Sequence, residues 1–294
     1  MVTNKLWTKE QEIDFFTKSL ELASPEQLFY TTENGEYFAY WPRDYKGFKT
    51  TLQSRNAFIG AYTEKWCQEV LQPIAKELNV YVLRNVICEQ LELTKLSPAD
   101  IALCKTNSVI QKPEDIIAIF EVKMSIVWNW QLCPEKFSLK CLGDYKTHSG
   151  TPSLLRSDSM LKAIGKSMTI RISTLEAAKI PIIILGNTPI NKSYYTKVDN
   201  LKNYGIIQGF WSLNPLDNND ENINVTPKKG FRRFDTFFDF RDKLLAILEE
   251  DLMFFGGMKP KDNLGKFIEI ANNEDTYENK AEKFLNLVRE SDDK

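Results

Sequence analysis

Three charged side chains at the ends of two apolar segments have the types and spacing for hydrolytic chemistry. Asp100 follows Pro98, and Glu121 and Lys123 lie two residues apart at the end of an apolar run that begins at Ile116. On a strand, residues i and i+2 point to the same face, so Glu121 and Lys123 should project side by side. A charge beside an apolar strand is costly unless it is paired or binds a metal. The spacing therefore predicts a metal-assisted hydrolytic site.

Such a site would contain the groups that hydrolysis of a phosphodiester requires. Asp100 and Glu121 would supply hard oxygen ligands for Mg²⁺, and the main-chain carbonyl of Val122 would add another. The magnesium ion would lower the pKa of a bound water and offset charge on the phosphate. Lys123 would orient the nucleophile or stabilise the transition state. The simpler interpretation is a surface ion pair, because an acid-x-Lys triplet at a strand end is common.

The surrounding pattern predicts the elements that would position these residues. Strands are expected over 80–87, 100–104 and 116–123, and the polar segment 105–115 suits a wide hairpin loop. In that pairing Asp100 lies opposite Glu121, with Cβ atoms about 5 Å apart. Helical spacing of apolar residues and capping residues predict further helices over 8–23, 54–78, 151 onward and 194–203. Short apolar runs predict further strands over 180–185 and 206–213.

The order helix, three strands, helix, strand predicts an α/β (α+β) fold with a mixed central β-sheet flanked by helices. We expect three regions along the chain. Residues 1–53 form an N-terminal helix and an aromatic, basic segment packed on the core, and 54–213 form the core itself. Residues 214–294 form a polar linker and a C-terminal helical segment, with amphipathic helices over 231–255 and 273–290.

Composition excludes several classes of site. His148 is the single histidine, so multi-histidine zinc sites and nucleases built on paired histidines are excluded. The five cysteines form no C-x-x-C pair, which argues against a zinc ribbon and a disulfide framework. The sequence has no secretory signal and no apolar run near the roughly 20 residues that span a bilayer, so we expect no membrane association and a cytoplasmic location.

Nucleic-acid binding is neither excluded nor required by the charge. The net charge of −2 is not that of a basic nucleic-acid binder, although a cleft can be locally positive. Two short clusters of basic and aromatic residues could contact phosphates, one around Arg43 and Lys46 and one over 228–234. Solvated surface is the alternative for both clusters.

Pro98 and Asp100, followed by Glu121 and Lys123, give the chain a resemblance to the PD-(D/E)xK nuclease superfamily, and within it to type II restriction endonucleases. The resemblance covers roughly residues 54–213, which parse as the αβββαβ core of that superfamily. One departure is that Ala99 separates the proline from the aspartate, which lowers the specificity of the match. The flanking segments would then be additions particular to this chain.

The resemblance implies a Mg²⁺-dependent, sequence-specific endonuclease that acts on double-stranded DNA as a homodimer. It also implies a prokaryotic cell as host, defence against foreign DNA and a cognate DNA methyltransferase as functional partner. An additional acidic ligand is expected on the helix before the first core strand, where Glu69 borders the apolar stripe and Glu64 points away on a helical wheel. The loop and helix after Lys123 would face DNA through Lys146, His148, Arg156, Ser159, Lys162 and Lys166.

Two other functions fit the same sequence. One is a repair, recombination or structure-specific DNA nuclease, which would share the fold and chemistry but not the target. The other is a non-catalytic nucleic-acid-binding protein that keeps the fold without the reaction. The complete set of Asp100, Glu121 and Lys123 argues against this last alternative.

Overall fold

The computed structural model describes residues 6–49, 52–136, 138–215, 223–254 and 259–290. The chain forms two compact units, Met1–Leu252 and Met253–Lys294. Both sheets and the predicted site lie in the first unit. Among the described residues, no helix has the length and apolarity needed to cross a bilayer.

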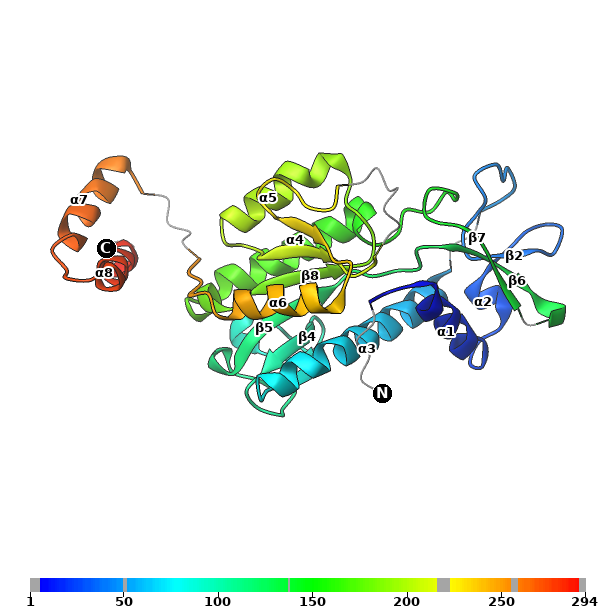
Figure 1. Cartoon of the computed structure of the whole chain (residues 1–294), viewed down its shortest axis with the longest axis horizontal. Helices are drawn as coiled ribbons and strands as arrows, with labels where there is room; N and C mark the ends of the chain where they lie inside the picture. Colours follow the sequence, from blue (N-terminus) through cyan, green and yellow to red (C-terminus); the bar gives the residue numbers. More distant parts are fainter. Residues whose placement is uncertain (1–5, 50–51, 137, 216–222, 255–258, 291–294) are drawn as a thin grey trace. The chain divides into compact units, whose positions relative to one another are not determined.

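A six-stranded mixed sheet forms the centre of the first unit, which confirms the predicted fold class (Figure 1). In chain order its strands are β3 (Tyr81–Val86), β4 (Ala99–Cys104), β5 (Ile116–Val122), β8 (Ile182–Gly186), β9 (Gly209–Ser212) and β10 (Phe231–Arg233). The first three are antiparallel neighbours, and β5, β8, β9 and β10 run parallel. Every residue of β8 is buried, as expected for a central parallel strand.

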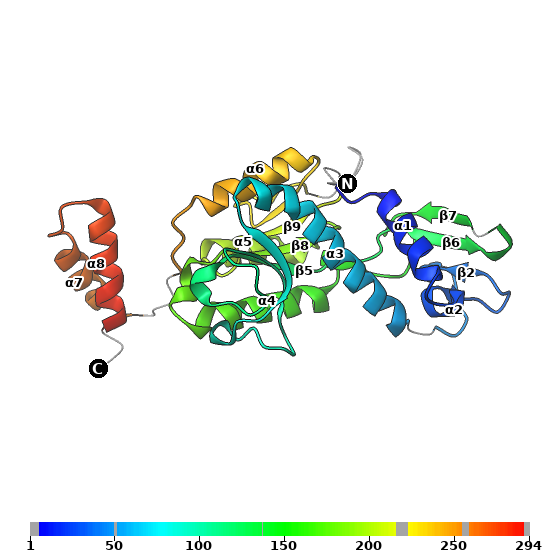
Figure 2. The same ribbon diagram turned by 90° about the horizontal axis from the view of Figure 1, so that it is seen from below.

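Helices cover both faces of this sheet (Figures 1 and 2). One face packs against α3 (Gln53–Glu77) and α6 (Phe237–Leu248), and the other carries α4 (Ser157–Ser173) and α5 (Tyr195–Asn203). Successive side chains of β5 point to opposite faces of the sheet. Phe120 therefore joins the core under α3, whereas Glu121 faces the side of α4. Helix α3 forms where Ile59, Trp66 and Val70 make an apolar stripe, and it continues through Pro73.

A second, four-stranded antiparallel sheet was not predicted from the sequence. Its order is β1-β2-β6-β7, with the strands β1 (Tyr30–Thr31), β2 (Tyr37–Phe38), β6 (Asn129–Cys133) and β7 (Ser138–Gly143). The β6–β7 hairpin is inserted between β5 and α4, and it pairs with the N-terminal segment that also carries α1 (Lys9–Leu20) and α2 (Pro25–Leu28). The N-terminal region is therefore bound into the fold by strand pairing with residues that follow the predicted site.

A buried carboxylate fastens helix α1 to the connection between the two sheets. Glu12 accepts hydrogen bonds from the main-chain nitrogens of Val127 (2.5 Å) and Trp128 (3.2 Å) and from the indole nitrogens of Trp7 and Trp130. Burial raises the pKa of Glu12 to about 7, although these four donors oppose the shift. The segment that leaves β5 is thus held by a single side chain of the N-terminal helix.

Several boundaries differ from the sequence-based expectation. The helix expected from Thr151 begins at Ser157, because a short 3₁₀ turn over Ser153–Leu155 precedes it. The core does not end at 213: β10 joins the sheet, α6 packs beneath it, and the first compact unit extends to Leu252. In the second unit, α8 (Tyr277–Glu290) was expected, whereas α7 (Lys261–Ala271) was not.

Candidate active site

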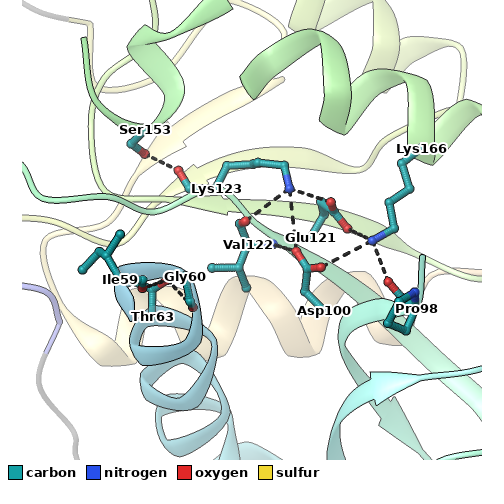
Figure 3. Close-up of polar contacts among 10 residues, drawn as sticks. All are labelled: Ile59, Gly60, Thr63, Pro98, Asp100, Glu121, Val122, Lys123, Ser153 and Lys166. Atoms are coloured by element: carbon teal, nitrogen blue, oxygen red, sulfur yellow. Dashed lines mark hydrogen bonds and ion pairs between the residues drawn. The ribbon is translucent and has the colours of Figure 1, made fainter. Parts of the chain in front are cut away.

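The predicted acidic pair is assembled by the register of the β4–β5 hairpin. Ile101 pairs with Phe120, which brings Asp100 beside Glu121 at the end of the antiparallel pairing. Asp100 Oδ2 accepts a hydrogen bond of 2.7 Å from the main-chain nitrogen of Val122 (Figure 3). The carboxylate of Asp100 therefore satisfies a donor of β5 and is fixed by it. The predicted juxtaposition of the two carboxylates is confirmed.

Three predicted ligand oxygens converge on the ammonium group of Lys123. Its Nζ lies 2.6 Å from Glu121 Oε1, 3.3 Å from the carbonyl oxygen of Val122 and 3.7 Å from Asp100 Oδ2 (Figure 3). The same two carboxylates and carbonyl are the donors that a hard divalent cation prefers. The donor set therefore fits Mg²⁺ at this point, and a cation there would take the contacts that Lys123 now makes.

Lys166, predicted as a DNA contact on the polar face of its helix, lies within this cluster. Its Nζ lies 2.6 Å from Glu121 Oε2 and 3.4 Å from Asp100 Oδ1, and it donates to the carbonyl oxygen of Pro98 at 2.7 Å. The side chain is 19% exposed, as is that of Lys123. Helix α4 thus contributes a second lysine from the layer that covers the sheet.

The charges in this cluster balance. Glu121 is 5% exposed, and burial, followed by repulsion from Asp100, raises the pKa of its carboxyl. Lys123 and Lys166 oppose that increase. Burial acts to lower the pKa of Lys166, but attraction to Glu121 and Asp100 outweighs it and leaves the pKa raised. Two carboxylates and two ammonium groups therefore share a site shielded from solvent, which a lone charge could not occupy cheaply.

The acidic residue of α3 that interacts with this cluster is Glu64, whereas the sequence-based prediction was Glu69. Burial and then repulsion from Asp100 raise the pKa of Glu64, which also interacts with the charges of Glu121 and Lys123. Glu69 is exposed on a different side of the helix, where its charge acts on Tyr62. The helical wheel separated the two residues, but it did not show which side of α3 faces the cluster, because the apolar stripe of α3 faces several layers of the molecule.

A buried hydrogen-bond network holds the chain that leaves β5. Ser153 Oγ donates to the carbonyl oxygen of Lys123 at 2.6 Å and accepts from the nitrogen of Asn187 at 3.1 Å (Figure 3). The amide side chain of Asn187 in turn forms two hydrogen bonds with the main chain of Ser125. Ser153 has a positive φ of 49° in the turn before α4. No local pattern marks these supporting residues, because each acts through a partner distant in sequence.

A groove of about 510 Å³ opens beside the site. It lies between α3, the end of β5, the turn before α4 and the segment that follows β2. Its lining includes Lys123 and Val122, together with Trp41, Asn56, Gly60, Arg156 and Ser159. The groove therefore gives a ligand access to one end of the carboxylate–lysine cluster.

The other predicted DNA contacts fall into two groups. Arg156 and Ser159 line the groove, so their placement agrees with contact to a ligand bound there. Four further basic residues are exposed on the surface, but none of them is among the residues that line the groove: Arg43, Lys46, Lys146 and Lys162. Arg156 and Lys162 each form an ion pair with Asp158.

His148 is a structural residue rather than a DNA contact. It is 2% exposed and stacks on Tyr40 with a ring-centroid distance of 3.8 Å. Nδ1 accepts a hydrogen bond from the nitrogen of Gly150 (3.0 Å), so Nε2 carries the proton towards the carbonyl oxygen of Val127 (3.3 Å). Burial lowers the pKa of His148 to about 4, which keeps the ring neutral.

The ligands available for a metal at this site come from few residues. Among the described residues, no three His, Cys, Asp or Glu side chains form a metal-binding group, so a cation here would depend on Asp100, Glu121 and the carbonyl of Val122. Comparisons with protein-family models, curated proteins and solved structures found no match to this chain.

Proposed function

We propose that this protein is a Mg²⁺-dependent endonuclease that hydrolyses phosphodiester bonds in double-stranded DNA at specific sequences. The observation that supports this best is the convergence of Asp100, Glu121 and the carbonyl of Val122 on one cationic group at the end of β5. Apart from the inserted β6–β7 hairpin, the element order α3, β3, β4, β5, α4, β8 also agrees with the αβββαβ core expected from the sequence.

Each residue of the cluster has a distinct part in the proposed reaction. Asp100 and Glu121 would hold Mg²⁺ with the carbonyl of Val122, and the ion would lower the pKa of a water molecule and offset charge on the phosphate. Lys123 lines the groove, so its ammonium would be available to orient the attacking water or stabilise the phosphate. Ser153 keeps the main chain of Lys123 in place.

The groove suggests how DNA would reach the cluster. Arg156 and Ser159 line it, and both side-chain types bind phosphate oxygens or base edges. A net charge of −2 requires that contact with DNA be confined to such a locally basic surface. Cutting both strands would need two copies of the site, so we propose a homodimer. A prokaryotic, cytoplasmic restriction enzyme with a cognate DNA methyltransferase is the role that fits this activity.

Incubation of a phage genome with the full chain and Mg²⁺, compared with EDTA, tests the proposal. We expect discrete fragments in Mg²⁺ and none in EDTA. Glu121→Gln and Lys123→Ala should each abolish cutting while the circular-dichroism spectrum stays unchanged. Cutting by either variant at the wild-type rate would refute the assignment of the site. A smear would instead indicate a structure-specific or repair nuclease, and DNA binding without cutting would indicate a non-catalytic binder.

A further inference from the structure

The two lysines of the cluster do not have equivalent positions. Lys123 contacts both carboxylates and the carbonyl of Val122, so it occupies the point where the three ligand oxygens meet. Lys166 contacts the other oxygen of each carboxylate, Glu121 Oε2 and Asp100 Oδ1. Together the two ammonium groups engage all four carboxylate oxygens.

The anchoring of Lys166 differs as well. Lys166 projects from α4 and donates to the carbonyl oxygen of Pro98. Pro98 and Val122 lie on opposite sides of the two carboxylates (Figure 3). A cation bound to Asp100, Glu121 and the carbonyl of Val122 would take the contacts of Lys123 and leave those of Lys166 in place. Lys166 would therefore remain a fixed positive charge next to the bound cation.

We propose that Lys166 is a charge-balancing residue that weakens cation binding in the free protein and, once a cation is bound, adds positive charge that attracts a phosphate. This inference rests on the proposed function of the same site. Without DNA, the charge of Lys166 opposes a divalent cation at Asp100 and Glu121. With a cation bound, these two carboxylates, the cation and Lys166 carry a net positive charge, which attracts the anionic phosphate.

The charge of Lys166 has two measurable consequences. Removal of the positive charge at Lys166 should strengthen cation binding to the free protein. It should also lower the affinity of the cation-loaded protein for DNA, because the loaded cluster is then less positive. Substitution of a residue that only stabilises the fold would not produce both effects together.

Titration of the free full-length protein with Mn²⁺, followed by electron paramagnetic resonance at pH 8, tests the first consequence. We expect Lys166→Met to bind Mn²⁺ at least tenfold more tightly than the wild type, which corresponds to about 1.4 kcal/mol. Lys166→Arg should restore the wild-type affinity because it keeps the charge. Lys162→Met is the matched control, since Lys162 lies on the same helix but pairs with Asp158 outside the cluster. This control should leave Mn²⁺ affinity unchanged.

The second consequence is tested by measuring duplex DNA affinity in saturating Ca²⁺. Under this condition the wild type should bind DNA several-fold more tightly than Lys166→Met. Mn²⁺ binding by Lys166→Met that is equal to or weaker than wild-type binding, including no binding by either, would overturn the inference. Because the Mn²⁺ titration contains no DNA, its outcome is separate from that of the cleavage assay. Tighter binding in a protein that does not cut DNA would support the role of Lys166 and reject the nuclease.

Discussion

At the scale of single residues, the position of a carboxylate relative to the cluster matters more than its presence on helix α3. Glu64 and Glu69 lie five positions apart on the same helix, and repulsion from Asp100 and Glu121 helps to raise the pKa of Glu64. Five residues correspond to about 500° of helical rotation, so the two side chains leave α3 in clearly different directions. Their different exposure follows from this rotation.

Substitution of these two residues should therefore have unequal effects on cation binding. Glu64→Gln removes a negative charge near the cluster and should weaken Mn²⁺ binding at pH 8 by three- to tenfold, about 1 kcal/mol. Glu69→Gln is the matched control and should change the affinity by less than twofold. Equal effects in the two variants would show that Glu64 has no special relation to the site.

Glu12 should give the stability of the protein a measurable pH dependence. Its pKa is raised from 4.5 to about 7 in the folded protein, so the folded state binds more protons than the unfolded state between these values. The free energy of unfolding should therefore fall by about 3 kcal/mol from this residue as pH rises from 4.5 to 7. Urea denaturation of Glu12→Gln across this range should lack that component. An identical pH slope in the variant would contradict the assignment.

The residues of the central cluster could be predicted because their signal is local. Asp100, Glu121 and Lys123 lie at strand ends recognisable from apolar runs, and a hairpin loop fixes their register. The surroundings of Lys166 and His148 were not predicted, because they are set by packing across elements. The sequence shows that a lysine lies on a helix, but not that this helix turns it towards two carboxylates.

At the scale of elements, the central strands and helices follow from composition, whereas the second sheet does not. Strands β1 and β2 have two residues each, too short for an alternation pattern to be visible. Residues 129–143 form a hairpin whose partner, β2, lies about 90 positions earlier in the chain. Pairing over such a separation leaves no local pattern, so no strands were predicted over these residues.

Gly60 on α3 offers a test of the groove at this scale. A Cβ atom added at Gly60 would meet no atom within 4 Å, and this residue lines the groove. Gly60→Leu should thus leave the protein as stable or more stable by up to about 1 kcal/mol, because glycine disfavours a helix interior. It should also lower duplex DNA affinity at least tenfold by filling the groove.

The control for this substitution is Gly265→Leu in α7, where an added Cβ atom also meets no atom within 4 Å. It should gain similar helix stability without loss of DNA affinity. Thermal unfolding and fluorescence anisotropy measure the two quantities. Wild-type DNA affinity in Gly60→Leu would show that DNA does not use this groove.

At the scale of the whole molecule, the first compact unit contains every feature used in the proposed reaction. Both sheets, the carboxylate–lysine cluster and the groove lie within Met1–Leu252. The boundary expected near residue 213 was wrong because β10 completes the sheet after a polar segment that resembles a linker. Sequence composition alone does not distinguish a linker from a loop that returns to the same sheet.

A chain that ends at Leu252 should fold without the second unit. We expect its thermal midpoint to lie within about 3 °C of the full-length value and its Mn²⁺ affinity to be unchanged, because the buried core of the sheet is complete. Differential scanning calorimetry and the Mn²⁺ titration check this result. Loss of a cooperative transition would show that residues 253–294 are required for the fold of the first unit.

The most direct test is a crystal structure of the protein with Mn²⁺ and its anomalous scattering. The account predicts one Mn²⁺ site within about 2.0–2.3 Å of oxygens from Asp100, Glu121 and the carbonyl of Val122, with Lys123 displaced towards the groove and Lys166 still on Glu121. An anomalous map without a peak at this position, with Lys123 still bound to the two carboxylates, would contradict the central claim.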